Sequence, residues 1–363
     1  MGKTTLITGG AGYIGSHTTL ALIDAGKKVL VLDNLCNSCR ESLVRLEYLT
    51  RTRVDFIEGD IRDTNLLDDI FRHYDIDAVV HFAGLKSVEE SIRKPLDYYA
   101  NNVVGTLNLC RAMARSEVFK LVFSSSAMVY GAPRQIPIIE DLGTGKPINP
   151  YGRTKLLIEE LLTDLCLSDP QWRIAVLRYF NPIGAHESGL IGENPNGRPN
   201  NLLPCLTRVA MRQVPELTVY GSDYPTADGT CVRDYVHVVD LADGHLKALQ
   251  ALQSRNGIHA WNLGTGIGYS VLQIIRCFED MTGITIPFRF APRRAGDIAG
   301  CWADPGKAGR DLGWYAQRDL MQMIIDTWRW QMRNPHGYRS EIQRPGNGKP
   351  SSHSLKATRE GRF

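Results

Sequence analysis

The sequence lacks any long hydrophobic run, and no stretch approaches the ~18 consecutive apolar residues that a membrane-spanning helix needs. It also lacks a surplus of one charge, because 42 Lys and Arg residues against 39 Asp and Glu residues leave a net charge of only +3. No basic cluster of the kind that marks nucleic-acid-binding proteins is present. We therefore expect neither a membrane nor a nucleic acid among the partners of this protein.

Cysteine is present, but without a pattern. The eight Cys residues among 363 are scattered without the spacing of a disulfide framework, which predicts reduced thiols and a cytoplasmic location. An apolar strand follows Met1 almost directly, so we expect no signal peptide. Cys36 and Cys39 have the spacing of a redox or half-zinc motif, but zinc needs four ligands and no second pair occurs. We expect two unlinked loop thiols and no metal site.

Short β-branched runs alternate with helical patterns in the first half of the chain. Each run is nearly continuous in hydrophobicity and bounded by turn residues, as strands buried on both faces are. The predicted strands are 4–8, 29–33, 55–58, 78–82, 120–124 and 174–178, and two of the predicted helices are 15–25 and 151–168. The alternation predicts an α/β fold of the Rossmann type, built on a doubly wound parallel sheet.

The alternation breaks after Arg178. Residues 181–204 are rich in Asn, Gly and Pro, which is typical of long loops, and 264–338 carries shorter predicted elements. A strand and a helix return near 235–263. We expect 1–180 and 237–263 to form a cofactor-binding domain and 181–236 with 264–338 to form a smaller substrate-binding lobe. The polar stretch 339–363 has no apolar periodicity and predicts a disordered tail.

A glycine-rich turn opens the first predicted helix. Gly9, Gly12 and Gly15 let the backbone approach a pyrophosphate, to which the helix N-terminus offers N–H groups. Asp33 ends the second strand, where a carboxylate accepts hydrogen bonds from the adenine ribose and favours NAD over NADP. Asp60 follows the third strand, in a place suited to the adenine amino group. A capping role for Asp33 and an ordinary turn role for Asp60 are the alternatives.

Three polar residues have the spacing of an acid–base site. Tyr151 and Lys155 are four residues apart at the start of a predicted helix and so share one face. A phenol with a pKa of ~10 must be acidified to act as a base near neutrality, and a close ammonium does this by stabilising the phenolate. Ser126 follows the strand at 120–124, at the sheet edge where open α/β sheets bind ligands. Individually, the Tyr–Lys pair could be a chance surface pattern and Ser126 a helix cap.

Together these motifs resemble those of the UDP-glucose 4-epimerases, members of the extended short-chain dehydrogenase/reductase family, over about residues 4–338. The matching segments are 9–17, 33–35, 59–61, 81–86, 99–105, 124–131, 151–155, 178–182, 200–202, 232–235 and 291–297. The resemblance implies an NAD-dependent isomerase that inverts C4 of a UDP-hexose through a 4-keto intermediate. Tyr151 would take the O4 proton while the C4 hydride passes to tightly held NAD. Ser126 would hold O4, and Lys155 would bind the nicotinamide ribose and keep Tyr151 acidic.

The resemblance also implies which residues surround the two ligands. Those expected around NAD are Gly9, Gly12, Tyr13, Ile14, Gly15, Asp33, Asn34, Asn37, Ser38, Asp60, Ile61, Phe82, Ala83, Gly84, Lys86, Asn101, Ser124, Tyr151, Lys155 and Phe180. Those expected around the UDP-sugar are Lys86, Ser126, Tyr151, Asn181, Asn201, Leu202, Tyr220, Arg233, Arg294, Asp297 and Cys301. The two arginines would pair with the diphosphate, although an arbitrary arginine more often lies on a solvated surface. Relatives are commonly homodimers, which predicts a homodimer here.

Two positions depart from the pattern of the relatives. Many relatives have Thr where this chain has Met128, which cannot hydrogen-bond the sugar and makes the pocket more apolar. Relatives limited to plain hexoses tend to carry a bulky Tyr at the position of Cys301, and relatives accepting N-acetylated sugars carry a small residue. Cys301 therefore predicts turnover of UDP-GlcNAc and UDP-GalNAc as well as, or in preference to, UDP-Glc and UDP-Gal. A cysteine without effect on specificity is the alternative, because pocket walls can repack.

Two other functions fit parts of the sequence. A nucleotide-sugar 4,6-dehydratase of the same family would place an Asp-Glu pair just after the active serine, whereas Ala127 and Met128 stand here and cannot move a proton. A non-catalytic NAD-binding sensor would need no phenol base. The joint presence of Ser126, Tyr151 and Lys155 favours an enzyme over a sensor.

Overall fold

The computed structural model describes residues 3–195, 197, 199, 201–294 and 296–339. Of the predicted tail at 339–363, only Arg339 is among the described residues, and it ends the 3-10 turn Gly337–Arg339 rather than starting a tail. The rest of that prediction lies outside the described residues. Within the described ranges, no helix combines the length and the apolar character that crossing a membrane requires.

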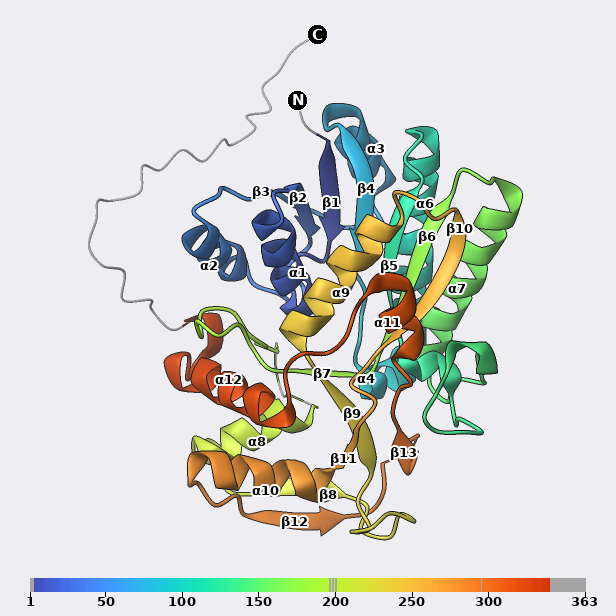
Figure 1. Ribbon diagram of the computed structural model, residues 1–363. Coiled ribbons are helices and arrows are strands. Elements are labelled where there is room, and N and C mark those ends of the chain that lie inside the picture. The colour runs from blue at the N-terminus through green and yellow to red at the C-terminus, as the bar shows by residue number, and fades with distance from the viewer. Residues whose placement is uncertain (1–2, 196, 198, 200, 295, 340–363) are drawn as a thin grey trace, which may run out of the picture.

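A seven-stranded parallel sheet forms the upper part of the molecule (Figure 1). Its spatial order is β10-β6-β5-β4-β1-β2-β3, so the chain winds outward from β1 in both directions, as the sequence predicted. The strands are β1 (Thr4–Thr8), β2 (Lys28–Asp33), β3 (Asp55–Glu58), β4 (Ile76–His81), β5 (Lys120–Ser126), β6 (Arg173–Tyr179) and β10 (Gly257–Leu263). The bounds of the first six differ by no more than two residues from those predicted, which confirms the α/β fold.

Successive strand residues point to opposite faces, and each face packs against its own helices. Leu6 and Leu30 belong to one apolar core, and Ile7 and Val31 to the other. The core of Ile7 includes residues of α1 (Tyr13–Asp24), α2 (Glu41–Thr50), α9 (Val238–Ala251) and α11 (Gly306–Leu312). The core of Leu6 includes residues of α3 (Thr64–His73), α6 (Gly105–Arg115) and α7 (Pro150–Ser168). The shorter helices α4 (Val88–Arg93) and α5 (Pro95–Tyr98) precede a π-helical turn at Tyr99–Val104.

The lower part of the molecule is more regular than the sequence predicted. The segment 181–204 was expected to be loop only, yet it contains the strand β7 (Asn181–Ile183), which pairs in parallel with β9 (Val232–His237), and the start of α8 (Leu202–Ala210). The region 264–338 contains helices of 12, 7 and 14 residues, which are α10 (Val271–Thr282), α11 and α12 (Leu320–Arg333). The other strands of the lower part are β8 (Leu217–Tyr220), β11 (Gly268–Ser270), β12 (Phe288–Ala291) and β13 (Gly300–Cys301).

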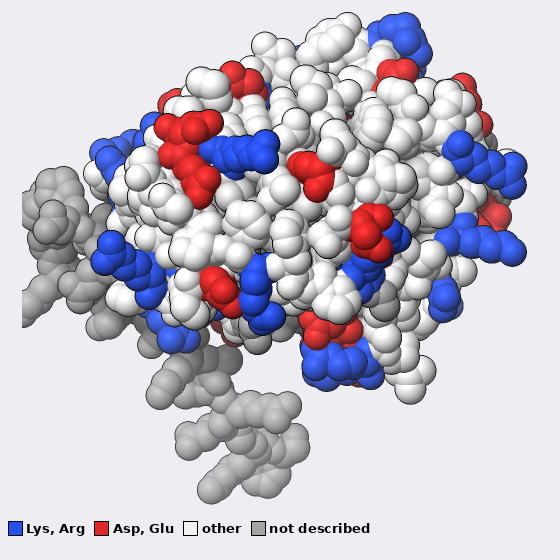
Figure 2. Space-filling view, turned by 90° about the horizontal axis from the view of Figure 1, so that it is seen from below, with Lys and Arg blue, Asp and Glu red and all other residues white. Residues whose placement is uncertain are grey.

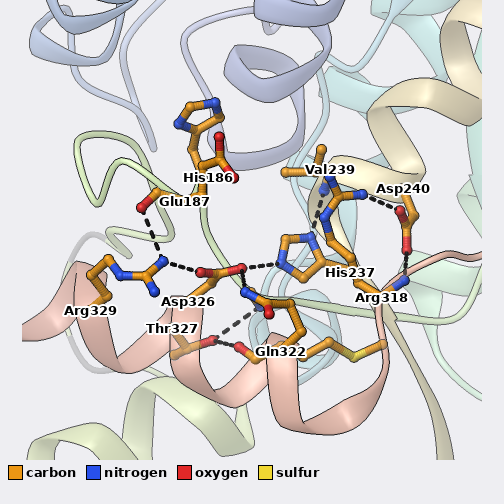
Figure 3. A network of polar contacts seen from close by, with 12 residues as sticks. His186, Glu187, His237, Val239, Asp240, Arg318, Gln322, Asp326, Thr327 and Arg329 are labelled. Carbon is orange, nitrogen blue, oxygen red and sulfur yellow. Dashed lines mark hydrogen bonds and ion pairs between the residues drawn. The ribbon is translucent and has the colours of Figure 1, made fainter.

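A buried polar network joins α12 to the start of α9 (Figure 3). The His237 ring accepts a hydrogen bond from the Val239 N–H through Nδ1, so its Nε2 carries the proton and donates to Asp326 Oδ2 at 3.2 Å. Burial favours the protonated form of Asp326, but hydrogen bonds from His237 and Gln322 outweigh it and lower the pKa of this carboxyl. The network thus fixes a charged helix residue against the segment that leads from the lower strands back into the main sheet.

Charges of both signs are interspersed on the lower face (Figure 2). Lys and Arg side chains lie next to Asp and Glu side chains there, and uncharged residues separate the pairs. Arg289, within β12, and Glu216, just before β8, form an ion pair 2.7 Å apart. Among the described residues drawn in this view, no stripe of one sign is seen.

Candidate active site

A cleft runs along the carboxyl ends of β1, β2, β3, β4 and β6, where the sequence placed the cofactor site. Most of the residues predicted around NAD line it together, although they come from distant parts of the chain. These are Gly9, Gly12, Tyr13, Ile14, Gly15, Asp33, Asn34, Asn37, Ser38, Ile61, Phe82, Ala83, Gly84, Lys86, Asn101, Tyr151 and Lys155. Asp60, Ser124 and Phe180 were predicted with them but do not line this cleft.

The glycine turn leaves room for an anion at the N-terminus of α1. Gly12 precedes the helix with no side chain capping it, and only Gly9 O, at 3.2 Å, lies near the place where a Cβ on Gly12 would be. Gly15 has a different role, because a Cβ there would come within 2.2 Å of Gly9 O. A helix end with free N–H groups and open space beside it fits the pyrophosphate of a dinucleotide.

Asp33 organises the loop that follows β2. Its Oδ2 accepts from Ala11 N at 3.0 Å, and its Oδ1 accepts from Leu35 N at 2.9 Å and Ser38 Oγ at 2.7 Å. A carboxylate has about four acceptor positions, so one is left for a ribose hydroxyl. Asp33 therefore also stabilises the loop after β2, and this structural role is compatible with cofactor binding.

Asp60 is committed to its own turn. Its carboxylate accepts from Arg62 Nε at 2.9 Å and Arg62 Nη2 at 2.7 Å, and from Asn34 Nδ2 at 2.8 Å. The hydrogen bonds from Arg62 lower the pKa of Asp60 to about 2 despite its partial burial. The structure therefore shows Asp60 in the turn role that was its alternative, while its neighbours Gly59 and Ile61 line the cleft.

Ser126 and Tyr151 meet at the end of β5. Ser126 caps the 3-10 turn Ala127–Tyr130 by accepting from Met128 N at 3.2 Å, and its hydroxyl acts on the Tyr151 phenol by lowering its pKa. Since its oxygen already accepts from the backbone, the serine proton is available to the phenol oxygen. Ser126 is thus a cap of this turn, and its role in the site stays a prediction.

Lys155 lies at the bottom of the cleft. Its Nζ donates to the main-chain oxygen of Ser124 at 2.7 Å and lies 4.8 Å from the centre of the Phe123 ring. Burial lowers the pKa of Lys155 to about 8, while the nearby Glu159 carboxylate acts in the opposite direction. The Lys155 ammonium is thus a stronger acid than an ordinary lysine, and it loses its proton near pH 8.

Among the chain's own residues, burial governs the acidity of Tyr151, and its expected acidification by Lys155 stays a prediction. Burial raises the pKa of the Tyr151 phenol, and the hydrogen bond from Ser126 is what counteracts it. The physical reason is that desolvation of the phenolate outweighs any attraction to an ammonium that is itself weakened and turned toward a carbonyl.

Glu193 connects the cleft to the lower part of the molecule. It lines the cleft, and its Oε1 lies 3.4 Å from Lys86 Nζ and 3.0 Å from Asn201 Nδ2. Lys86 and Asn201 were both predicted to contact the substrate, and this carboxylate brings them together. Leu202 follows Asn201 as the first residue of α8.

A second group of predicted substrate residues gathers around Asp297. Arg233 Nη2 lies 3.7 Å from its Oδ1 and Arg294 Nε lies 3.5 Å from its Oδ2. The Arg294 guanidinium also stacks over Tyr220, 4.5 Å from the ring centre. Two arginines, a carboxylate and an aromatic ring thus form one patch that suits a nucleoside with phosphate groups.

Cys301 stands directly opposite Arg233 in the pairing of β13 with β9. Its half-buried side chain packs against an apolar cluster that includes Phe180 and Ala127, and burial raises the pKa of the thiol to about 11. Asn181 is exposed next to Phe180, and Met128 lies against Gly152 beside Tyr151. The thiol is neutral and small, as the prediction about its pocket requires.

Sequence reasoning missed several residues that line the cleft. They are Ala11, Leu32, Cys36, Cys39, Gly59, Leu85, Tyr179, Gly192, Glu193, Asn194, Pro195 and Tyr338. Tyr179 could have been found as the residue that ends β6 beside Phe180, whereas Glu193 and Tyr338 lie in segments without a strand pattern. Cys36 and Cys39 are not joined in a disulfide, and no cluster of metal-binding side chains occurs in the described ranges.

Comparison with known proteins agrees with this geometry. A model of the NAD dependent epimerase/dehydratase family matches residues 5–264. The chain belongs to this family. The UDP-glucose 4-epimerase of Haemophilus influenzae is 55% identical over 334 residues, which cover 92% of this chain and 99% of that protein.

Solved structures of family members have the same fold. The Bifidobacterium longum UDP-glucose 4-epimerase, solved in complex with NAD+ and UDP, superposes with a TM-score of 0.90 at 48% identity and covers 92% of this chain and 100% of that one. The UDP-Glc/GlcNAc 4-epimerase of Campylobacter jejuni superposes with a TM-score of 0.79 at 35% identity, covering 91% and 99% of the two chains. NAD is the cofactor of the family, and the open space at Gly12 beside the uncapped end of α1 fits it.

Proposed function

We propose that the protein is a UDP-glucose 4-epimerase that keeps NAD bound throughout its cycle. The observation that carries this proposal is that Tyr151 and Lys155 line one cleft, with the Ser126 hydroxyl close enough to the Tyr151 phenol to lower its pKa. A hydroxyl donor aimed at a buried phenol, with an ammonium close by, is suited to proton transfer at a sugar hydroxyl. The 55% identity to a curated UDP-glucose 4-epimerase supports the same assignment.

The roles of the chain's own residues follow from their contacts. Tyr151 takes the proton from the sugar O4 and later returns it, and Ser126 donates to the oxygen that carries the negative charge. Lys155, held by the Ser124 carbonyl, favours the phenolate while it is protonated. Bound NAD supplies the hydride acceptor and donor. We propose that 1–180 and 237–263 hold it, and that 181–236 with 264–338 hold the UDP-sugar.

Inversion requires a firm grip on UDP and a loose one on the hexose, because the 4-keto sugar must turn to present its other face. The patch of Arg233, Arg294, Asp297 and Tyr220 provides the firm grip in this proposal. On the sugar side, the walls are formed by small or apolar side chains, among them Cys301, Phe180 and Met128. Such walls offer few hydrogen bonds that would hold the ring in one orientation.

We further propose that UDP-GlcNAc and UDP-GalNAc are accepted. Support comes from the small, neutral thiol of Cys301, which lies beside Phe180 opposite the diphosphate arginine Arg233. A Tyr at this position would fill the space that an N-acetyl group needs. The Campylobacter jejuni relative is a UDP-Glc/GlcNAc 4-epimerase, so dual specificity occurs on this fold.

We also propose that the protein is a homodimer. Four exposed apolar side chains, Ile92, Leu96, Val104 and Leu157, are 52%, 81%, 46% and 41% exposed. They lie on α4, α5, the π-helical turn and α7, which are elements that contact one another. Contiguous apolar surface of this kind marks association sites. The cytoplasmic location stays a prediction, with which eight cysteines outside any disulfide agree.

The deciding experiment compares wild type with Tyr151→Phe. Purified protein is incubated with UDP-galactose, and the C4 epimers are separated. The variant should lose about 10²–10⁴-fold in kcat, as expected for removal of a general base, while it retains NAD. Tyr315→Phe, at a tyrosine that is 58% exposed, serves as the control and should match wild type. Unchanged stereochemistry after long incubation with NAD-loaded wild type would refute the epimerase, and a 4-keto-6-deoxy product would reveal a dehydratase.

A further inference from the structure

His245 lies behind the strand end that carries Ser124 and Ser126. It is on α9, fully shielded from solvent, with Nδ1 2.8 Å from the Leu241 carbonyl oxygen and Nε2 2.9 Å from Ser124 Oγ. A carbonyl oxygen can only accept, so Nδ1 carries the ring proton and Nε2 has a free lone pair. The Ser124 hydroxyl therefore donates its proton to His245.

This assignment fixes the direction of the Ser124 hydroxyl. Its single proton is directed at His245, which leaves only oxygen lone pairs for any other neighbour. Tyr179, whose ring packs near that of His245, lines the cleft with Tyr151 and Lys155.

The same imidazole supports other walls of the cleft. Its ring lies 4.6 Å from the Phe82 ring and 6.1 Å from the Tyr179 ring, centre to centre. The residue it binds, Ser124, holds Lys155 Nζ at 2.7 Å through its main-chain oxygen. His245 itself does not line the cleft, and burial lowers its pKa to about 4, so the ring is neutral near pH 7.

We propose that His245 is a positioning residue. It accepts a hydrogen bond from the Ser124 hydroxyl and thereby holds the end of β5, whose Ser124 carbonyl binds Lys155, while its ring supports Phe82 and Tyr179 in the cleft wall. The inference rests on the proposed epimerase function for its kinetic consequence, but its structural consequence is a property of the cofactor site. If His245 only filled space, an apolar side chain of similar size would serve equally well.

The test compares His245→Met with His245→Gln. Methionine fills a similar volume without a strong acceptor, whereas the glutamine oxygen can still accept from Ser124. We expect His245→Met to weaken NAD binding and lower kcat, each by about tenfold, as loss of one oriented hydrogen bond implies, with KM for the UDP-sugar unchanged. His245→Gln should recover most of both. Leu249→Met, a buried change one turn along α9, controls for repacking and should match wild type.

Two readouts separate the possible failures. NAD affinity is measured by calorimetry on protein stripped and reloaded with NAD, and epimerisation is measured on the holoenzyme. If wild type binds NAD but does not epimerise, the proposed function fails while the His245 effect on NAD affinity is still measurable. Equal NAD affinity and kcat in wild type and a folded His245→Met variant would overturn the positioning role. Should that variant not fold, Ser124→Ala removes the same hydrogen bond, and wild-type behaviour of Ser124→Ala would overturn the role equally.

Discussion

Glu159 and Arg178 form a buried ion pair beneath the strand end that carries the site. Arg178 Nη2 lies 2.6 Å from Glu159 Oε2, and the two side chains are only 10% and 7% exposed. Glu159 also accepts from Ser125 on β5, and it lies one helical turn after Lys155 on α7. The pair therefore connects α7, β5 and β6 directly behind Ser126 and Tyr151.

Breaking this pair should destabilise the fold. Glu159→Gln leaves the Arg178 guanidinium buried without a counter-charge, which costs about 3–5 kcal/mol in the free energy of unfolding. Urea denaturation monitored by fluorescence measures the change. Glu160→Gln, at the exposed neighbouring position, is the matched control and should shift the free energy by less than about 0.5 kcal/mol. Equal effects of the two variants would contradict the burial argument.

Lys155 should contribute to function at the expense of stability. Its pKa is lowered to about 8 from an ordinary value of about 10.5 because the ammonium is buried, so the folded chain binds this proton less well than the unfolded chain. The penalty is full below about pH 8 and disappears as the pH rises toward 10.5. Lys155→Met should therefore abolish turnover yet raise the free energy of unfolding at pH 7 by about 1–3 kcal/mol.

Urea titrations of wild type and Lys155→Met at pH 7 and at about pH 9.5 check the sign of this effect. Other titrating groups are common to both proteins and cancel in the difference. The advantage of the variant should shrink at the higher pH. A variant that is less stable at both values by the same amount would show that the lysine mainly supplies packing.

Cys301→Tyr should separate the two substrate pairs. The phenol ring would occupy the space beside Phe180, so turnover of UDP-GlcNAc should fall by about tenfold or more while turnover of UDP-Glc changes little. Cys301→Ala is the control that keeps the space open and should retain both activities. The proposal about N-acetylated sugars is wrong if the Tyr variant handles the acetylated pair as wild type does.

Leu96→Glu should dissociate the proposed dimer. Leu96, on α5, is 81% exposed. A glutamate at this position would place an unpaired carboxylate in the dimer interface, and burying that charge would oppose association. Sedimentation velocity should show a dimer for wild type and a monomer for the variant. Leu167→Glu, at a leucine 79% exposed near the far end of α7, should remain dimeric. If wild type sediments as a monomer at all concentrations, the proposed homodimer is refuted.

Much of the architecture was determined by the sequence itself. The strands from β1 to β6, the glycine turn before α1 and the four-residue spacing of Tyr151 and Lys155 depend on local patterns of hydrophobicity and turn chemistry. Such patterns can be recognised in the sequence because strands, turns and helix starts depend mainly on residues that are close along the chain. The convergence of 17 predicted cofactor residues on one cleft follows from the parallel sheet, which brings the carboxyl ends of its strands to one edge.

Only the tertiary structure decided how the polar groups are paired. The Asp60 carboxylate is hydrogen-bonded to Arg62, and burial raises the pKa of Tyr151. Ser124 is hydrogen-bonded to His245, which lies 121 residues later in the sequence. Hydrogen-bond partners and desolvation depend on which segments far apart in the sequence pack together. No local sequence pattern predicts these contacts. The sequence thus set which chemical groups stand at the sheet edge, and the packing of α7 and α9 against that edge set their protonation and orientation.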